Sequence, residues 1–229
     1  MIAVLALTVA SVVGLSQPSY SGAELEARVV DSITGVPLEG VNVVATWEFE
    51  YLQPGIGEHR GRGFLLVQEA VTDAQGTFRF PPWGPKAIPD GLPGHAYLPP
   101  SAPALTFFKP EYGFKTIHNA ENYKYLDDPS YVGESLRRSY WNGKTIQLVR
   151  FGGSLQQYGK RFDLLPSVGA VTACPWTETP RYRAALIKEG ERLRKLGLRT
   201  GLPAIEDLQK KFDDGGCGSA SEYISEYLR

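Results

Sequence analysis

Two glycine-containing turns between alternating apolar segments constrain this fold more than any other feature. The first, residues 33–40, separates the β-type segment 27–31 from a segment in which Val41, Val43, Ala45 and Trp47 alternate. The second lies inside residues 71–80, which read Val-Thr-Asp-Ala-Gln-Gly-Thr-Phe-Arg-Phe. Glycine can take the positive φ that a tight reversal needs, and period-two runs of β-branched and aromatic residues are typical of strands. The pattern predicts antiparallel β-sheet.

The remaining strand candidates extend this pattern along two thirds of the chain. In the segment 41–50, one face is apolar and the other carries Asn42, Thr46, Glu48 and Glu50, so we expect one face in the core and one in solvent. A parallel α/β sheet would need helices between the strands, and the pattern has none there. The sequence therefore predicts a mainly β, antiparallel sandwich. The predicted strands are residues 24–30, 41–50, 64–72, 77–80, 104–109 and 144–149.

The first 23 residues are expected to direct export. Residues 1–15 are apolar and uncharged, and residues 16–23 are small or turn-forming, as in a secretory signal peptide. The apolar run is shorter than the roughly 20 residues of a membrane span. Cleavage is predicted between Ser16 and Glu24, and an uncleaved N-terminal anchor and a buried first element are the alternatives. We expect a periplasmic or extracellular protein that contacts a membrane only through this segment.

Residues 24–150 are predicted to form the sandwich domain and residues 151–229 a short helical C-terminal extension. Thr179-Pro180 reads as a cap with proline at the first helical position, and Ser219 begins a capping box. The two cysteines, Cys174 and Cys217, would meet an oxidising compartment after export. We therefore predict a disulfide between them, which would stabilise the fold by roughly 4 kcal/mol through loop closure.

Two long connections interrupt the β pattern. Residues 81–103 hold eight of the seventeen prolines, which predicts an extended loop without a strand ladder. Residues 117–143 are rich in aromatic side chains, and flat rings can stack on sugars or bury a peptide. Packing of this loop onto the sandwich is the stronger interpretation of the same residues. The candidate binding surface consists of Tyr123, Tyr125, Tyr131, Tyr140 and Trp141.

Motifs for catalysis are weak in this chain. His118 and Glu121 have a spacing that can present two zinc ligands, but a zinc hydrolase needs a third protein ligand and a general base. No Gly-x-Ser-x-Gly, phosphate-binding loop or dinucleotide fingerprint is present. A net charge of -1 without basic-aromatic interleaving argues against nucleic acid as a partner. The sequence predicts no catalytic residue, no metal and no cofactor.

Three motifs in order resemble the carboxypeptidase regulatory-like domain. They are Asp31-x-x-Thr34-Gly35-x-Pro37-Leu38-x-Gly40-Val41-x-Val43, Thr72-Asp73-x-x-Gly76-x-Phe78-x-Phe80 and Lys109-Pro110-Glu111-Tyr112, the last with Glu111 where that family usually has glycine. The resemblance covers residues 24–114 and extends to 150 if 144–149 supplies the last strand. It implies a seven-stranded, transthyretin-like (Ig-like) sandwich that acts as an accessory module. It transfers no functional residue, because the matched positions are turn and core positions.

Three hypotheses of function follow. The first is a non-catalytic exported module that binds a protein or a cell-envelope component. The second is a glycan-binding module that uses the loop aromatics, and the third and weakest is a metal-dependent hydrolase built on His118 and Glu121.

Overall fold

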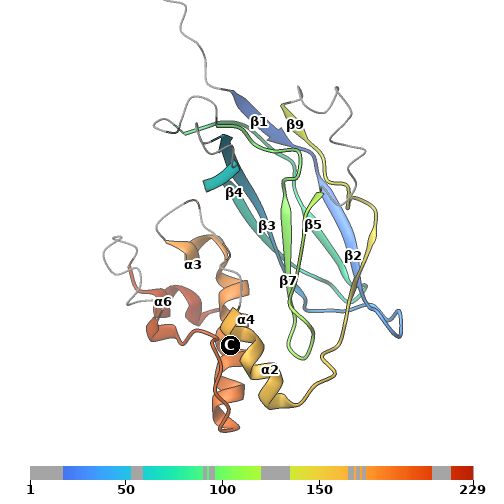
Figure 1. Ribbon diagram of the computed structural model, residues 1–229, viewed down its shortest axis with the longest axis vertical. Coiled ribbons are helices and arrows are strands. Elements are labelled where there is room, and N and C mark those ends of the chain that lie inside the picture. Colours follow the sequence, from blue (N-terminus) through green and yellow to red (C-terminus); the bar gives the residue numbers. More distant parts are fainter. Residues whose placement is uncertain are drawn as a thin grey trace, which may run out of the picture.

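The computed structural model describes residues 18–52, 59–89, 92, 96–119, 135–164, 168, 171, 174–207 and 218–228. This part of the chain is mainly β, with three sheets that pair mostly antiparallel and a group of helices beside them (Figure 1). The strands are β1 (Ser19–Gly22), β2 (Leu25–Asp31), β3 (Asn42–Leu52), β4 (His59–Val71), β5 (Thr77–Phe80), β6 (Trp83–Ala87), β7 (Ala104–Phe108), β8 (Lys115–Ile117), β9 (Leu136–Arg137) and β10 (Thr145–Leu148). The helices are α2 (Leu155–Arg161), the 3-10 turn η3 (Phe162–Leu164), α3 (Pro175–Glu178), α4 (Pro180–Lys195) and α6 (Ala220–Ser225).

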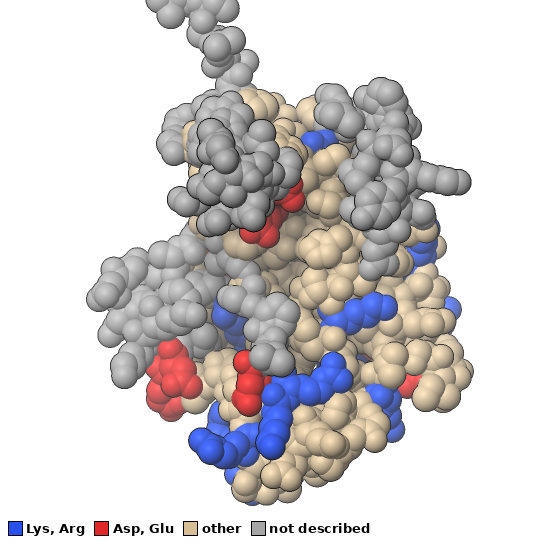
Figure 2. All heavy atoms as spheres, viewed as in Figure 1, with Lys and Arg blue, Asp and Glu red and all other residues tan. Residues whose placement is uncertain are grey.

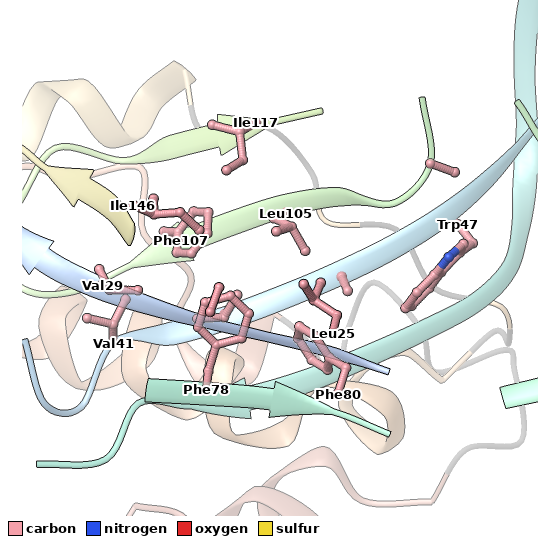
Figure 3. Close-up of a cluster of buried hydrophobic side chains, with 14 of the residues drawn as sticks. Leu25, Val29, Val41, Trp47, Phe78, Phe80, Leu105, Phe107, Ile117 and Ile146 are labelled. Atoms are coloured by element: carbon pink, nitrogen blue, oxygen red, sulfur yellow. The ribbon is translucent and has the colours of Figure 1, made fainter. Parts of the chain in front are cut away.

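Two sheets, with strand orders β10-β2-β5 and β4-β3-β7-β8, turn their apolar sides into one core. In Figure 3, side chains of β5 and β7 point toward each other, and the rings of Phe78 and Phe107 meet edge to face at 6.0 Å between centroids. All six predicted strands are present, with ends shifted by a few residues. The third sheet, β6-β1-β9, was not predicted.

The turn motifs act as structural corners, as the sequence predicts. The Asp31 carboxylate accepts hydrogen bonds from the backbone N–H groups of Ile33 and Thr34, both at 2.9 Å, and from the Tyr112 hydroxyl at 2.9 Å. These donors hold the pKa of Asp31 at about 2, below its ordinary 3.8, with the Thr34 N–H as the largest cause. Gly35 follows with a φ of 70°, which closes the turn. The first and third motifs are thus joined through one carboxylate.

Acid should weaken this corner. The pKa of Asp31 is lowered by folding, so its stabilisation is complete above pH 3.8 and is lost as pH falls toward about 2. We expect the free energy of unfolding, measured by urea titration, to fall across this window in the wild type and to fall less in Asp31→Asn. Glu191→Gln, at an exposed carboxylate on α4, is the control and should keep the wild-type slope. Equal slopes in all three proteins would contradict the assignment.

Four of the described strands, β1, β6, β8 and β9, lie outside the predicted ones, and two of them bear on earlier expectations. Residues 83–87, inside the proline-rich connection, pair with β1 as β6. The prediction of a loop without a ladder was wrong here because β6 lies at the edge of its sheet, where proline is tolerated. Ser19–Gly22, at the end of the predicted leader, forms β1 with Tyr20 buried. Cleavage after Ser16 would retain this strand, whereas cleavage after Ala23 would remove it.

The helices cover the outer side of the four-stranded sheet. Val44, Val67 and Phe108 project from that side and pack with Tyr182 and Leu193 of α4 in a second hydrophobic cluster. The Phe108 ring lies 6.2 Å from the Phe162 ring and 6.3 Å from the Tyr182 ring between centroids. The face of β3 that was predicted to be exposed to solvent is therefore buried along part of its length. The prediction was wrong there because the C-terminal helices pack on that face.

A carboxylate from the sheet caps α4. Glu69 on β4 accepts hydrogen bonds from the backbone N–H groups of Arg181 and Tyr182, each at 3.0 Å. Thr179, the predicted cap, lies at the N-cap position but makes no side-chain capping bond. Burial raises the pKa of Glu69, and the two N–H groups oppose that shift. By contrast, Ser219 caps α6 as predicted, accepting from the Glu222 N–H at 3.2 Å.

Removing the Glu69 carboxylate should loosen α4 from the sheet. We expect Glu69→Ala to lower the free energy of unfolding by about 1–2 kcal/mol, the usual loss for a deleted helix cap. Urea titration followed by helical circular dichroism measures this loss. Glu191→Ala, on an exposed face of the same helix, should change stability by less than about 0.5 kcal/mol. Equal losses in the two variants would show that Glu69 does not act as the cap.

Within the described residues, none of the helices combines the length and apolarity that crossing a membrane requires.

Candidate functional site

Part of the predicted aromatic surface falls on described residues. Tyr123, Tyr125 and Tyr131 lie outside them. Tyr140 and Trp141 lie half-buried in the turn before β10, with their rings edge to face at 5.3 Å between centroids. The Trp141 indole N–H donates to the backbone oxygen of His118 at 3.1 Å, and its ring packs against the central core. These contacts favour a packing role for Trp141.

A buried amide that sequence reasoning missed holds this turn. The Asn119 side chain accepts from the Tyr140 N–H at 3.0 Å and from the Ser139 hydroxyl at 3.1 Å. It also donates to the backbone oxygens of Ala102 at 2.8 Å and Arg138 at 2.9 Å. Asn119 therefore ties two connections together, since its amide can accept and donate at once. Its partners are distant in the sequence, so no local motif marks it.

Truncating Trp141 should test packing against sugar binding. We expect Trp141→Ala to lower the free energy of unfolding by about 2 kcal/mol, because a half-buried ring and one indole hydrogen bond are lost. Tyr223→Ala, at an exposed aromatic on α6, is the control and should be nearly neutral. A Trp141→Ala protein that keeps wild-type stability but loses a specific signal on a glycan array would favour the glycan hypothesis instead.

Of the predicted metal-binding pair, His118 and Glu121, only His118 belongs to the described residues. His118 is exposed, and Glu121 lies outside the described residues. His118 lines a cavity of about 70 Å³ together with Glu48 and Glu50. Burial raises the pKa of Glu48, and the neighbouring Glu50 adds to the shift. Across the described ranges, no three His, Cys, Asp or Glu side chains are grouped so that they could hold a metal ion.

The predicted disulfide also falls partly outside the described residues. Cys174 is half-buried just before α3, and Cys217 lies in the undescribed range. The pairing stays a prediction.

A groove at the junction of sheet and helices is the best-defined candidate site. Two adjoining cavities of about 230 and 420 Å³ share the side chains of Arg150 and Phe151. We call them together the junction groove. The first cavity adds Glu111, Gly153, Leu155, Tyr158 and Arg192, and the second adds Gly113, Phe114, Lys115, Gln147, Val149, Gly152 and Arg161.

Backbone contacts between three segments shape the junction groove. The Phe151 N–H donates to the backbone oxygen of Glu111 at 2.8 Å, and the Glu111 N–H donates to the Tyr158 hydroxyl at 2.9 Å. Tyr158 lies on α2, which begins at a complete capping box formed by Ser154 and Gln157. Burial, with smaller effects from Glu189, raises the pKa of the Tyr158 hydroxyl. Tyr158 thus stays neutral and joins the sheet to the helices.

Positive charge dominates the junction groove. Lys115, Arg150, Arg161 and Arg192 line it, and among the described residues Glu111 is the one carboxylate in the lining. Figure 2 shows Lys and Arg side chains gathered over the part of the molecule where α2 and α4 lie. Since the whole chain has a net charge of -1, this excess is local.

The charged groups of the groove are held in place. Arg192 is bound through two hydrogen bonds, at 2.8 and 2.7 Å, to the buried carboxylate of Glu189. Arg161 lies over the Phe151 ring at 5.3 Å from its centroid, and Arg150 pairs with Glu111 at 3.2 Å. Such an arrangement can bind anions, because arginine presents planar donors that match carboxylate and phosphate.

Sequence reasoning missed the junction groove. Its cations come from β8, the end of β10, α2 and α4, and they are separated by up to 77 positions between Lys115 and Arg192. The only local signal was the Phe151-Gly152-Gly153 boundary, where the β pattern gives way to helix.

Comparison with known proteins gives little further guidance. No protein-family model and no curated protein matches the chain. A chlorocatechol 1,2-dioxygenase from Pseudomonas putida is similar over 59% of this chain and 61% of its own, with 16% identity and a TM-score of 0.29. A 9R-lipoxygenase from Cyanothece PCC8801 is similar over 85% of this chain and 27% of its own, with 11% identity and a TM-score of 0.26. The chain spans less than two thirds of the length of either protein.

Proposed function

We propose that this protein is a non-catalytic, exported binding module with a transthyretin-like sandwich, and that it binds a protein or a cell-envelope component through the junction groove. The two sheets around the central core have three and four strands in the described residues, which supports the seven-stranded arrangement. The ordered turn motifs support it too, since Asp31, Gly35 and Tyr112 serve as corners.

The junction groove is the observation that carries this proposal. Cationic and apolar side chains from the sheet and from the helices line one hollow. Hydrogen bonds from the Glu111 N–H to Tyr158 and from Arg192 to Glu189 hold its walls in place, so little conformational freedom would be lost on binding. The combined size of the two cavities falls within the usual range of ligand sites, about 300–1,000 Å³.

The proposal predicts that retention by cell envelopes depends on the junction groove. Purified protein is mixed with an envelope fraction and sedimented, and the bound share of wild type is compared with that of an Arg150→Glu, Arg161→Glu double variant. We expect the double variant to bind at least about tenfold more weakly, because charge reversal at two sites repels the partner.

Arg79→Glu is the matched control. Arg79 is also an exposed arginine paired with glutamates, but it lies on β5 away from the groove. It should bind like the wild type. Equal retention of all three proteins would contradict the proposal, and stoichiometric zinc that is lost on His118→Ala would favour the hydrolase hypothesis instead.

A further inference from the structure

We propose that the junction groove takes an extended, acidic and partly apolar peptide segment of a partner protein, and that Glu111 occupies the place of a ligand carboxylate on Arg150 until the peptide binds. This inference rests on the proposed function and names the chemistry of the partner.

The junction groove has a position suited to an extended chain. It lies where the edges of the two facing sheets meet, because β8 ends one sheet and β10 ends the other. The Lys115 ammonium on β8 donates to the backbone oxygen of Gln147 on β10 at 3.1 Å. The Gly113 N–H donates to the backbone oxygen of Val149 at 2.9 Å. From this point the groove continues past Arg150 and Phe151 to α2 and α4. Cations therefore lie at several places along its length.

The lining is complementary to a segment that mixes carboxylates with apolar side chains. Arg150 is 61% exposed and Arg192 is 41% exposed, so both side chains are accessible to a ligand. Val149 and Leu155 are 61% and 51% exposed, unusually high for large apolar residues. One lies in each cavity, on either side of Arg150 and Phe151. Apolar ligand residues could cover them.

Other anionic macromolecules fit this lining less well. Sugars and nucleobases bind by stacking on open aromatic faces. The Phe151 ring already has Arg161 over it and the tilted Tyr158 ring at 5.3 Å between centroids. A membrane surface would meet a broad basic face, whereas here the cations line a hollow between two sheet edges and two helices. The geometry favours a peptide.

Glu111 is the residue that makes this proposal specific. Its φ is 68°, and it is the one non-glycine residue with positive φ in the described part of the chain. Such a backbone is strained for a residue with a Cβ atom and is found mainly where the surroundings or a function maintain it. Here it places the Glu111 carboxylate 3.2 Å from the Arg150 guanidinium, at 60% exposure. A ligand carboxylate would bind Arg150 in the same way and must displace Glu111.

Two variants should therefore change affinity in opposite directions. The probe is a short fluorescent peptide of alternating glutamate and leucine, and the dissociation constant is measured by anisotropy at about 0.15 M salt, where exposed charges are largely screened beyond 8 Å. We expect Arg150→Gln to weaken binding about tenfold, the equivalent of 1.4 kcal/mol, because a charge-assisted contact is lost. Glu111→Gln should tighten binding about threefold, because the internal competitor no longer carries charge.

Controls separate the groove from general charge attraction. Arg79→Gln should bind the peptide like the wild type. A peptide with glutamine in place of glutamate should bind at least about tenfold more weakly. The inference is overturned if the acidic peptide does not bind, if Arg79→Gln and Arg150→Gln lose equal affinity, or if Glu111→Gln weakens binding.

Two further arms identify another source of the anionic group. Vesicles of phosphatidylcholine with phosphatidylglycerol test a lipid headgroup, and polygalacturonate tests an acidic polysaccharide. Binding of either that depends on Arg150, without binding of the peptide, would overturn the peptide inference. If the peptide fails while retention by envelopes still requires Arg150, the proposed function stands without this inference. Retention that does not depend on the junction groove would contradict the proposed function itself.

Discussion

Coverage of the outer face of the four-stranded sheet is the constraint on which the rest of this structure depends. Val44 and Phe108 lie on that face with exposures of 0% and 1%. Burying side chains of this size is worth about 1.5–3 kcal/mol each. The C-terminal helices supply the cover and thereby form a layer on the four-stranded sheet instead of a separate appendage (Figure 1). Their docking also forms one wall of the junction groove.

Polar contacts then fix how the helices sit. Glu69 caps α4 from the sheet, and the hydroxyl of Tyr158 on α2 accepts the Glu111 N–H from the loop after β7. Each contact joins groups that would be costly to bury without a partner. Hydrophobic cover alone would allow the helices to slide, whereas these directional bonds specify one position. The contact between Tyr158 and Glu111 also lies in the lining of the junction groove.

The junction groove and the predicted aromatic surface differ in which side chains stay accessible. Trp141 points its indole N–H at a backbone oxygen and packs on the core, so its polar and apolar parts are both engaged. Arg150 and Arg161 remain largely accessible beside a hollow. Aromatic content predicted a binding surface in the loop 117–143, but the accessible side chains of the groove are cationic. This difference is why the proposed function rests on the groove rather than on the loop aromatics.

The sequence by itself determined the local structure: where strands run, where they turn, and where helix replaces strand. Gly35 and the bonds of Asp31 to the Ile33 and Thr34 N–H groups act over a few residues, and the alternation in β3 encodes its core face, so these features were predictable. It could not show that β6 forms at a proline-tolerant edge, that Glu69 rather than Thr179 caps α4, or that Val44 is covered. Only the tertiary structure decided these points and the junction groove. Each depends on contacts between groups that are distant along the chain. A sequence pattern shows whether a residue prefers an apolar or a polar environment, but it does not show which distant residues will contact it.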